Sequence, residues 1–162
     1  MAFGLVVTKL FMSKFATKLI DNIKGRQYFE QLIILPDDVD LLKIDIENED
    51  GIWDSYSGEL EEKYRKSFRG LESIMERVAN LQPVNEYQFR DITPAKELIK
   101  EYEFKYQDLR AYGIKTFNGK LMLLGGYKND QRRDYVTFRS LKKRYLEFSS
   151  KQQNKHGKSN KK

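Results

Sequence analysis

The sequence contains no cysteine and a single histidine, His156, which lies in a polar stretch near the C-terminus. The absence of cysteine excludes a disulfide framework and thiolate catalysis. With one histidine, a His-based catalytic triad and a His-rich metal site are excluded as well. We therefore expect no metal and no organic cofactor, and any catalysis has to use Arg, Lys, Tyr or carboxylate side chains.

Long apolar runs are also missing. No stretch approaches the roughly 18–20 apolar residues that a membrane-spanning helix needs. Lys9, Lys14 and Lys18 interrupt the apolar N-terminal segment, which makes it a poor signal peptide. We expect a cytoplasmic protein with no membrane partner. A length of 162 residues favours one domain with room for an added N-terminal element.

Positive charge is concentrated in the last third of the chain. Residues 1–94 carry 12 Lys/Arg against 17 Asp/Glu, whereas residues 95–148 carry 13 against 7. Residues 149–162 carry five lysines and no acidic residue, and we expect them to form a disordered Lys-rich tail. This asymmetry indicates either a polyanionic partner or a solvated Lys-rich surface.

The first part of the chain alternates between helical and strand-like patterns. Apolar residues recur at helical spacing across 5–24, so we expect an amphipathic helix within an N-terminal extension, 1–25. Two runs of strand-forming residues follow, 28–35 and 39–46. Apolar residues recur at helical spacing again from about residue 56 to Leu81, so we expect a second helix there.

The last third has the clearest pattern. Residues 104–117 are typical of one strand, or of two strands with a bulge. Asn118-Gly119 predicts a tight hairpin, because a type I′ turn needs positive φ at both central residues. Residues 120–124 form the return strand, which Gly125-Gly126 should end. A helix is expected over 135–148.

This segment also contains the candidate functional residues. The ribose 2′-OH of RNA is a built-in nucleophile, so cations that position a phosphate and stabilise its transition state can support cleavage without a metal. Alternation along a strand places Arg110, Tyr112 and Ile114 on one face and Lys115 on the other. The same charges also fit passive RNA binding. The candidates are Arg110, Lys115, Lys128, Arg132, Arg133 and Tyr135.

The segment YQDLRAYGIKTFNGKLMLLGGYKNDQRRDYVTFRSLKKRYLEF, Tyr106 to Phe148, resembles the RelE/ParE toxin superfamily, in particular its HigB and phage Gp49-like branch. Leu109-Arg110 matches the Leu-Arg pair that enters a strand in that family, and Asn118-Gly119 matches its tight hairpin. The next two features follow in the same order as in that family. They are an apolar strand that ends in a glycine-containing basic segment and a terminal helix. The resemblance implies an α+β fold in which helices pack on one face of a small antiparallel sheet, here with an extra N-terminal helix.

The resemblance further implies a toxin domain over residues 26–148. Such a toxin is a messenger-RNA endonuclease that works on the ribosome without a metal and is held inactive by a cognate antitoxin. Carried over to this chain, Arg110 would contact the phosphate, and Lys128, Arg132 or Arg133 would take the basic position after the apolar strand. Tyr135 would stack on a base or assist proton transfer.

Further contacts with RNA are expected from cations outside this set. We expect Lys142, Lys143 and Arg144 to form a solvated helix face that can contact ribosomal RNA, and Lys115 to be a lesser RNA-binding residue. Two alternatives stay open. The chain could be a superfamily member that acts by binding alone, as a gyrase poison or a degenerate toxin, or it could be an unrelated basic RNA-binding adaptor.

Overall fold

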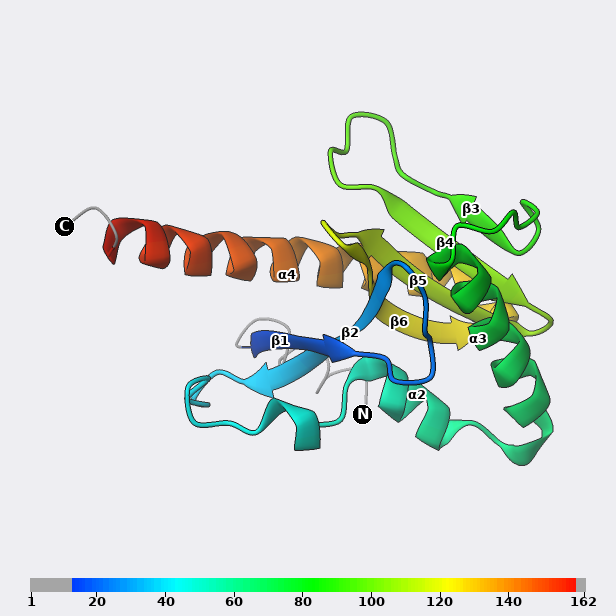
Figure 1. The fold of residues 1–162 in the computed structure, drawn as a ribbon, viewed down its shortest axis with the longest axis horizontal. Coiled ribbons are helices and arrows are strands. Elements are labelled where there is room, and N and C mark those ends of the chain that lie inside the picture. Colours follow the sequence, from blue (N-terminus) through cyan, green and yellow to red (C-terminus); the bar gives the residue numbers. More distant parts are fainter. Residues whose placement is uncertain (1–12, 160–162) are drawn as a thin grey trace.

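The computed structural model of the chain describes residues 13–159, with side chains as far as Asn154. This range contains six strands, three α-helices and three short 3₁₀ turns (Figure 1). The strands are β1 (Ser13–Leu19), β2 (Tyr28–Pro36), β3 (Phe89–Asp91), β4 (Glu101–Tyr106), β5 (Leu109–Lys115) and β6 (Gly119–Tyr127). The helices are α2 (Ile52–Glu59), α3 (Arg65–Ala79) and α4 (Gln131–Ser159), and the 3₁₀ turns are η1 (Ile46–Asn48), η2 (Glu62–Tyr64) and η3 (Lys128–Asp130).

The strands form one sheet in the order β1-β2-β6-β5-β4-β3. Neighbouring strands are antiparallel except β2 and β6, which run parallel with Tyr28 opposite Gly119. The predicted α+β class is therefore confirmed. The sheet is mixed rather than wholly antiparallel. Strand β2 pairs antiparallel with β1 on one side and parallel with β6 on the other.

Helices cover both faces of this sheet, whereas the sequence led us to expect them on one face. Trp53 of α2 and Leu71 of α3 pack with Phe29 and Phe104 on the first face. Phe138 of α4 packs with Tyr112 and the other residues of a second apolar cluster on the opposite face. The alternation of the strands allows this, because successive side chains of β5 and β6 supply both clusters.

The expected N-terminal helix is wrong for the part that the structure describes. Residues 13–19 form an edge strand that pairs antiparallel with β2, with Phe15 opposite Ile34. The apolar spacing of residues 13–19 fits both the period of a helix and the two-residue period of a strand. Pairing with β2 decides in favour of the strand. The rest of the predicted helix, 5–12, lies outside the described residues.

The second predicted strand, 39–46, is also wrong, because this segment forms turns that lead into η1.

Two turns shape the antiparallel part of the sheet. The segment 104–117 contains two strands, which is the second of the two arrangements expected from the sequence, and Gln107 adopts a positive φ of 51° in the turn between β4 and β5. A bulge lies between Tyr112 and Gly113. The hairpin at Asn118-Gly119 is confirmed, with the Thr116 N–H donating to the Gly119 carbonyl over 2.9 Å. Neither residue of that pair has a positive φ, so the expected type I′ geometry is wrong.

Three further boundaries differ from the sequence-based expectation. The predicted long helix to Leu81 is divided into α2 and α3. Strand β6 continues through Gly125 and Gly126 rather than ending there. Helix α4 does not stop at Phe148 but continues to Ser159, which contradicts a disordered tail over 149–159. None of the helices within residues 13–159 has the length and apolar character needed to cross a membrane.

Candidate functional site

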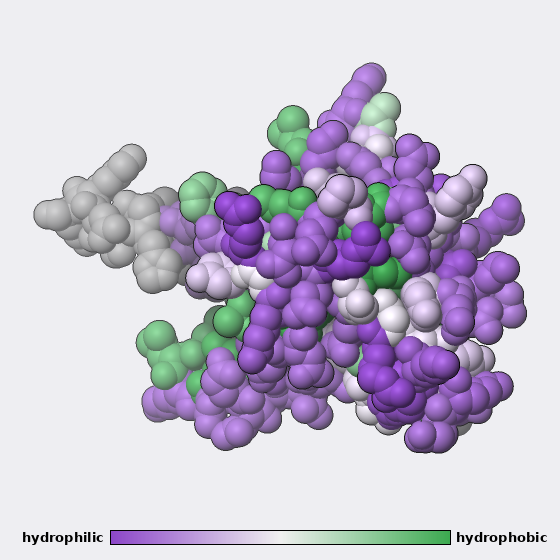
Figure 2. All heavy atoms as spheres, turned by 45° about the vertical axis from the view of Figure 1, so that its right-hand side comes forward, coloured by the Kyte–Doolittle hydropathy of each residue, from purple (hydrophilic) through white to green (hydrophobic). Residues whose placement is uncertain are grey.

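Several of the predicted site residues lie at one end of the sheet, where β5 begins and where β6 leads into α4. Arg110 on β5 lies opposite Gly126 on β6. The Lys128 N–H donates to the Asp108 carbonyl over 2.8 Å, which fixes η3 beside the turn between β4 and β5. Figure 2 brings this end of the molecule forward and shows mainly hydrophilic side chains over it.

Three exposed cations lie at this end, and we call them the basic corner: Lys128, Arg132 and Arg133. Arg133 is partly neutralised, since its Nη2 lies 3.1 Å from Oδ2 of Asp130. Within residues 13–159, neither Lys128 nor Arg132 forms a salt bridge. Unpaired surface cations are hydrated and ready to exchange water for phosphate oxygens, so this corner can bind an anion directly.

Arg110 does not share this exposure. Its side chain sits on the face of β5 that α4 covers, and the residue is only 7% exposed. Its Nη1 donates to the carbonyl oxygens of Gln107 and Leu109 over 2.7 and 2.8 Å. The guanidinium thus stabilises, through Nη1, the turn between β4 and β5, where Gln107 has its positive φ.

Three buried polar atoms on β5 and α4 have no hydrogen-bond partner among the described residues. They are Nε of Arg110, the Tyr112 hydroxyl and Oδ2 of Asp134. Asp134 comes from the first turn of α4 and packs against Gly126, where a Cβ would collide with its carboxylate. Burial raises the pKa of Asp134 to about 6, although the nearby Arg133 opposes this shift. Nothing in the sequence singles out Asp134, because an acid in the first turn of a helix is ordinary.

Tyr135 is occupied by other side chains. Its hydroxyl donates to Oε2 of Glu103 over 2.7 Å and accepts from Arg90 Nη2 over 3.2 Å and from Gln131 Nε2 over 3.0 Å. Burial, and then the hydrogen bond to Glu103, raises the pKa of the Tyr135 hydroxyl. The phenol therefore stays protonated at neutral pH and acts as a link between α4, β3 and β4, rather than as a free proton donor at the basic corner.

The remaining predicted cations lie away from the corner. Lys115 is exposed at the opposite end of β5, about 16 Å from Arg110 by the rise of a strand. The expectation of a solvated face is wrong for Lys142, which is 4% exposed and donates to Glu101 Oε2 over 2.7 Å. Lys143, next to it, is exposed, and Arg144 lies 3.9 Å from Glu147.

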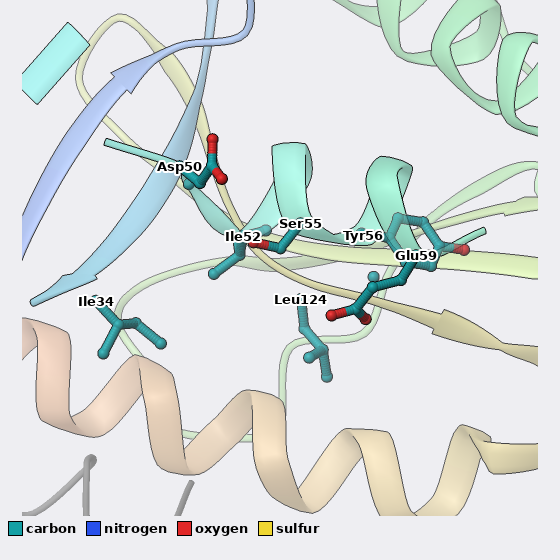
Figure 3. A pocket seen from close by; sticks show the side chains of 9 residues that line it. Ile34, Asp50, Ile52, Ser55, Tyr56, Glu59 and Leu124 are labelled. Atoms are coloured by element: carbon teal, nitrogen blue, oxygen red, sulfur yellow. The ribbon is translucent and has the colours of Figure 1, made fainter. Parts of the chain in front are cut away.

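A separate cavity of about 290 Å³ lies between α2 and the sheet, where β2 and β6 diverge beyond the pair Gln31–Met122 (Figure 3). Its ionisable lining is acidic, with Asp50 and Glu59 at its rim. A phosphate would be repelled there, so the cavity does not compete with the basic corner as an RNA site.

The residues described, 13–159, contain no group of His, Asp or Glu side chains that could hold a metal ion. Comparisons of the chain with protein-family models, with curated proteins and with solved structures find no match. The choice of a function therefore depends on the chemistry of the corner itself.

Proposed function

We propose that this protein is the toxin of a type II toxin–antitoxin system, a metal-independent endoribonuclease that cleaves messenger RNA on the ribosome in the cytoplasm. The observation that supports it most is the basic corner, where Lys128 and Arg132 are exposed and, among residues 13–159, unpaired. They follow the strand that ends beside Arg110, in the order that the resemblance to RelE/ParE toxins implies.

The proposed reaction needs no cofactor. The ribose 2′-oxygen attacks the adjacent phosphorus, the bond from phosphorus to the 5′-oxygen breaks, and a 2′,3′-cyclic phosphate and a 5′-hydroxyl result. The 2′-OH proton passes to solvent, and the leaving 5′-oxygen takes a proton from water. Lys128, Arg132 and Arg133 contribute by holding the phosphate in line and by stabilising the charge that develops on its oxygens.

The roles of two other residues differ from those that the resemblance implies. Arg110 is a positioning residue, because its guanidinium holds the turn to which η3 is attached through Lys128 and Asp108. Tyr135 likewise positions the start of α4 through Glu103. The proposed contacts to RNA therefore come from the exposed cations, with the cognate antitoxin covering the same corner in the inactive state.

A second function, RNA binding without cleavage, is favoured by one specific observation. Arg110 and Tyr135, the two residues expected to assist the transition state, are both held by protein groups. A chain in which only the surface cations meet RNA would block translation by occupying the ribosome.

The test is inducible expression of the wild type and of the triple variant Lys128→Ala/Arg132→Ala/Arg133→Ala, with mapping of new RNA 5′ ends carrying a hydroxyl. Lys43→Ala is the matched control, because Lys43 is an exposed lysine in the loop after β2 whose nearest carboxylate, Asp40, is 4.0 Å away. We expect growth arrest with in-frame cuts in the wild type and in the control, and a loss of cleavage of at least a hundredfold in the triple variant.

Arrest with intact mRNA that also requires the three cations would favour binding without cleavage. Cuts that persist in the triple variant, or the absence of both arrest and RNA binding in the wild type, would overturn the proposed function. Circular dichroism of the purified triple variant shows whether the fold is retained.

A further inference from the structure

The cavity between α2 and the sheet has apolar walls and plays no part in the proposed function. Strands β2 and β6 pair only as far as Gln31 and Met122, and α2 contacts both strands where they diverge. Ile34 of β2, Ile52 of α2 and Leu124 of β6 line the cavity and are each half-buried (Figure 3). Its volume of about 290 Å³ is close to the lower limit of roughly 300 Å³ for small-ligand sites, so it suits a slender chain rather than a ring system.

A carboxylate lies at each end of α2 along this cavity. Asp50 comes just before Gly51, the N-cap of α2, and Glu59 is the last residue of the helix, which is about 12 Å long. Both acids are exposed and line the cavity, and neither forms a salt bridge within residues 13–159. Figure 3 shows Asp50 and Glu59 on opposite sides of Ile52. The cavity therefore combines an apolar middle with an unpaired negative charge at each end.

Hydrogen-bond acceptors also lie between the two acids. The Lys128 N–H donates to the Asp108 carbonyl, and the backbone groups of an antiparallel pair point alternately toward and away from the neighbouring strand. Gly125 lies three positions before Lys128, so it directs its N–H and C=O away from β5, on the side of the cavity that it lines. Ser55 of α2 lines the same cavity. The Gly125 carbonyl and the Ser55 hydroxyl can both accept a proton from a cation in the middle of a bound chain.

We propose that this cavity binds a linear aliphatic polyamine, with one terminal ammonium beside Asp50 and the other beside Glu59. The methylene groups between them pack on the apolar walls, as the stems of lysine side chains do on apolar surfaces. Spermidine, with an amine at each end and one within its chain, is about as long as α2. The inference rests on the cavity and its charges alone, and not on the proposed nuclease.

Other classes of ligand match this arrangement less well. Both acids repel an anion, and an amino acid would bring its own carboxylate to one of the two acidic ends. A single alkylammonium leaves one acid without a partner. Carboxylates at opposite ends of α2 cannot share one metal ion, because metal–oxygen bonds are only about 2–2.6 Å long. An unbranched chain with a cation at each end satisfies both acids.

Isothermal titration calorimetry of the full-length protein with spermidine tests the site. We expect Asp50→Asn/Glu59→Gln to weaken binding at least about tenfold, since each acid contributes a charge-assisted hydrogen bond. The matched control is Asp38→Asn/Glu86→Gln, which removes two exposed acids elsewhere and has the same net charge as the first variant. The control should bind spermidine like the wild type. All four substitutions keep the shape of an exposed side chain, so the fold is retained.

A third variant and two further ligands test the shape of the site. Ser55→Leu narrows the cavity and keeps both carboxylates, so it should weaken spermidine binding by a similar factor. Butylamine has one cation and should bind the wild type at least about tenfold more weakly than spermidine does. The amide of Nα-acetyl-lysine carries a lysine side chain without a free α-amine, and it should bind as weakly as butylamine.

Four results would count against the proposal. Equal losses in the double variant and its control would mean attraction by net charge alone, and a wild-type Kd for spermidine above about 10 mM would mean no site. Both results overturn the proposal. Wild-type affinity in Ser55→Leu would reject the cavity as the place of binding. Binding of the lysine amide as tight as that of spermidine would overturn the assignment to a free polyamine in favour of a lysine side chain from a partner protein.

Discussion

The Nζ of Lys142 lies 2.7 Å from Oε2 of Glu101, in an ion pair buried between α4 and β4. The same ammonium donates to the Ile99 carbonyl over 2.8 Å, and Arg139 Nε lies 3.1 Å from the other Glu101 oxygen. The middle of α4 is therefore attached to β4 by charge as well as by the apolar contacts of Phe138.

Removal of this ammonium should destabilise the protein. Lys142→Met leaves Glu101 buried with Arg139 as its remaining cation, so we expect the free energy of unfolding to fall by about 2–4 kcal/mol. Lys143→Met changes the adjacent, exposed residue and should stay within about 0.5 kcal/mol of the wild type. Urea unfolding measures both variants. Equal effects at the two positions would contradict the buried pair.

Lys120 is a buried lysine held among aromatic rings. Its Nζ lies 4.8 Å from the ring centroid of Tyr102 and 5.5 Å from that of Phe89, and the residue is 7% exposed. Burial, and then the neighbouring Lys115, lowers the pKa of the Lys120 ammonium.

The pH dependence of stability follows from this shift. Between the lowered pKa and the ordinary value of 10.5, the unfolded chain binds the extra proton, so stability rises as the pH rises through that window. Lys120→Met should remove this rise and change the free energy of unfolding at pH 7 by only about 1 kcal/mol, because the lost cation–π attraction offsets the relieved burial of charge. Denaturant unfolding from pH 7 to 10 checks it, with Lys43→Met, in the loop after β2, as the exposed control.

Asp134 should give a pH dependence of the opposite sign. Its pKa is raised to about 6, so the folded protein holds the proton more tightly than the unfolded chain, and stability falls as the pH rises from about 4 to 6. Asp134→Asn should abolish this fall and stabilise the protein at pH 7 by about 1–3 kcal/mol. Thermal unfolding across this range tests the idea. Asp38→Asn, at an exposed acid in the loop after β2, is the comparison, and an unchanged slope in Asp134→Asn would rule out the assignment.

Gly125 allows α2 to approach the sheet. A Cβ at this position would collide with the ring of Tyr56, whose hydroxyl donates to the Gly126 carbonyl over 2.7 Å. Gly125→Ala should therefore lower the free energy of unfolding by about 1–3 kcal/mol. Gly58, in α2, has open space around it, and Gly58→Ala should stabilise the helix by up to about 1 kcal/mol. Calorimetry of the two variants should show shifts of opposite sign.

Local patterns predicted the parts of the fold that depend on local sequence. The hairpin at Asn118-Gly119, the stripe of α3 and the part of α4 over 135–148 were predicted correctly because turn chemistry and apolar spacing act over a few residues. Strand β1 was missed because its identity comes from pairing with β2. The turn at Gln107 was missed because neither glycine nor asparagine marks its positive φ.

The functional role of the site residues stays a prediction, and the structure gives their positions. Arg110 lies opposite Gly126, close to the point where β6 leads to Lys128. Burial of Arg110 and Lys142 could not be predicted, because their partners come from turns and strands that only the tertiary fold brings close. Glu101 is 41 residues from Lys142 in the sequence.

The parallel pairing of β2 with β6 has a consequence for the order of folding during synthesis. Tyr28 and Gly119 are opposite each other but 91 residues apart, which corresponds to roughly 5–20 s of translation. Until β6 has left the ribosome, β1 and β2 form an isolated hairpin, which is marginal in water. The basic corner is assembled later still, since it also needs α4. A growing chain therefore lacks the cations and the strand ends that its finished form presents together.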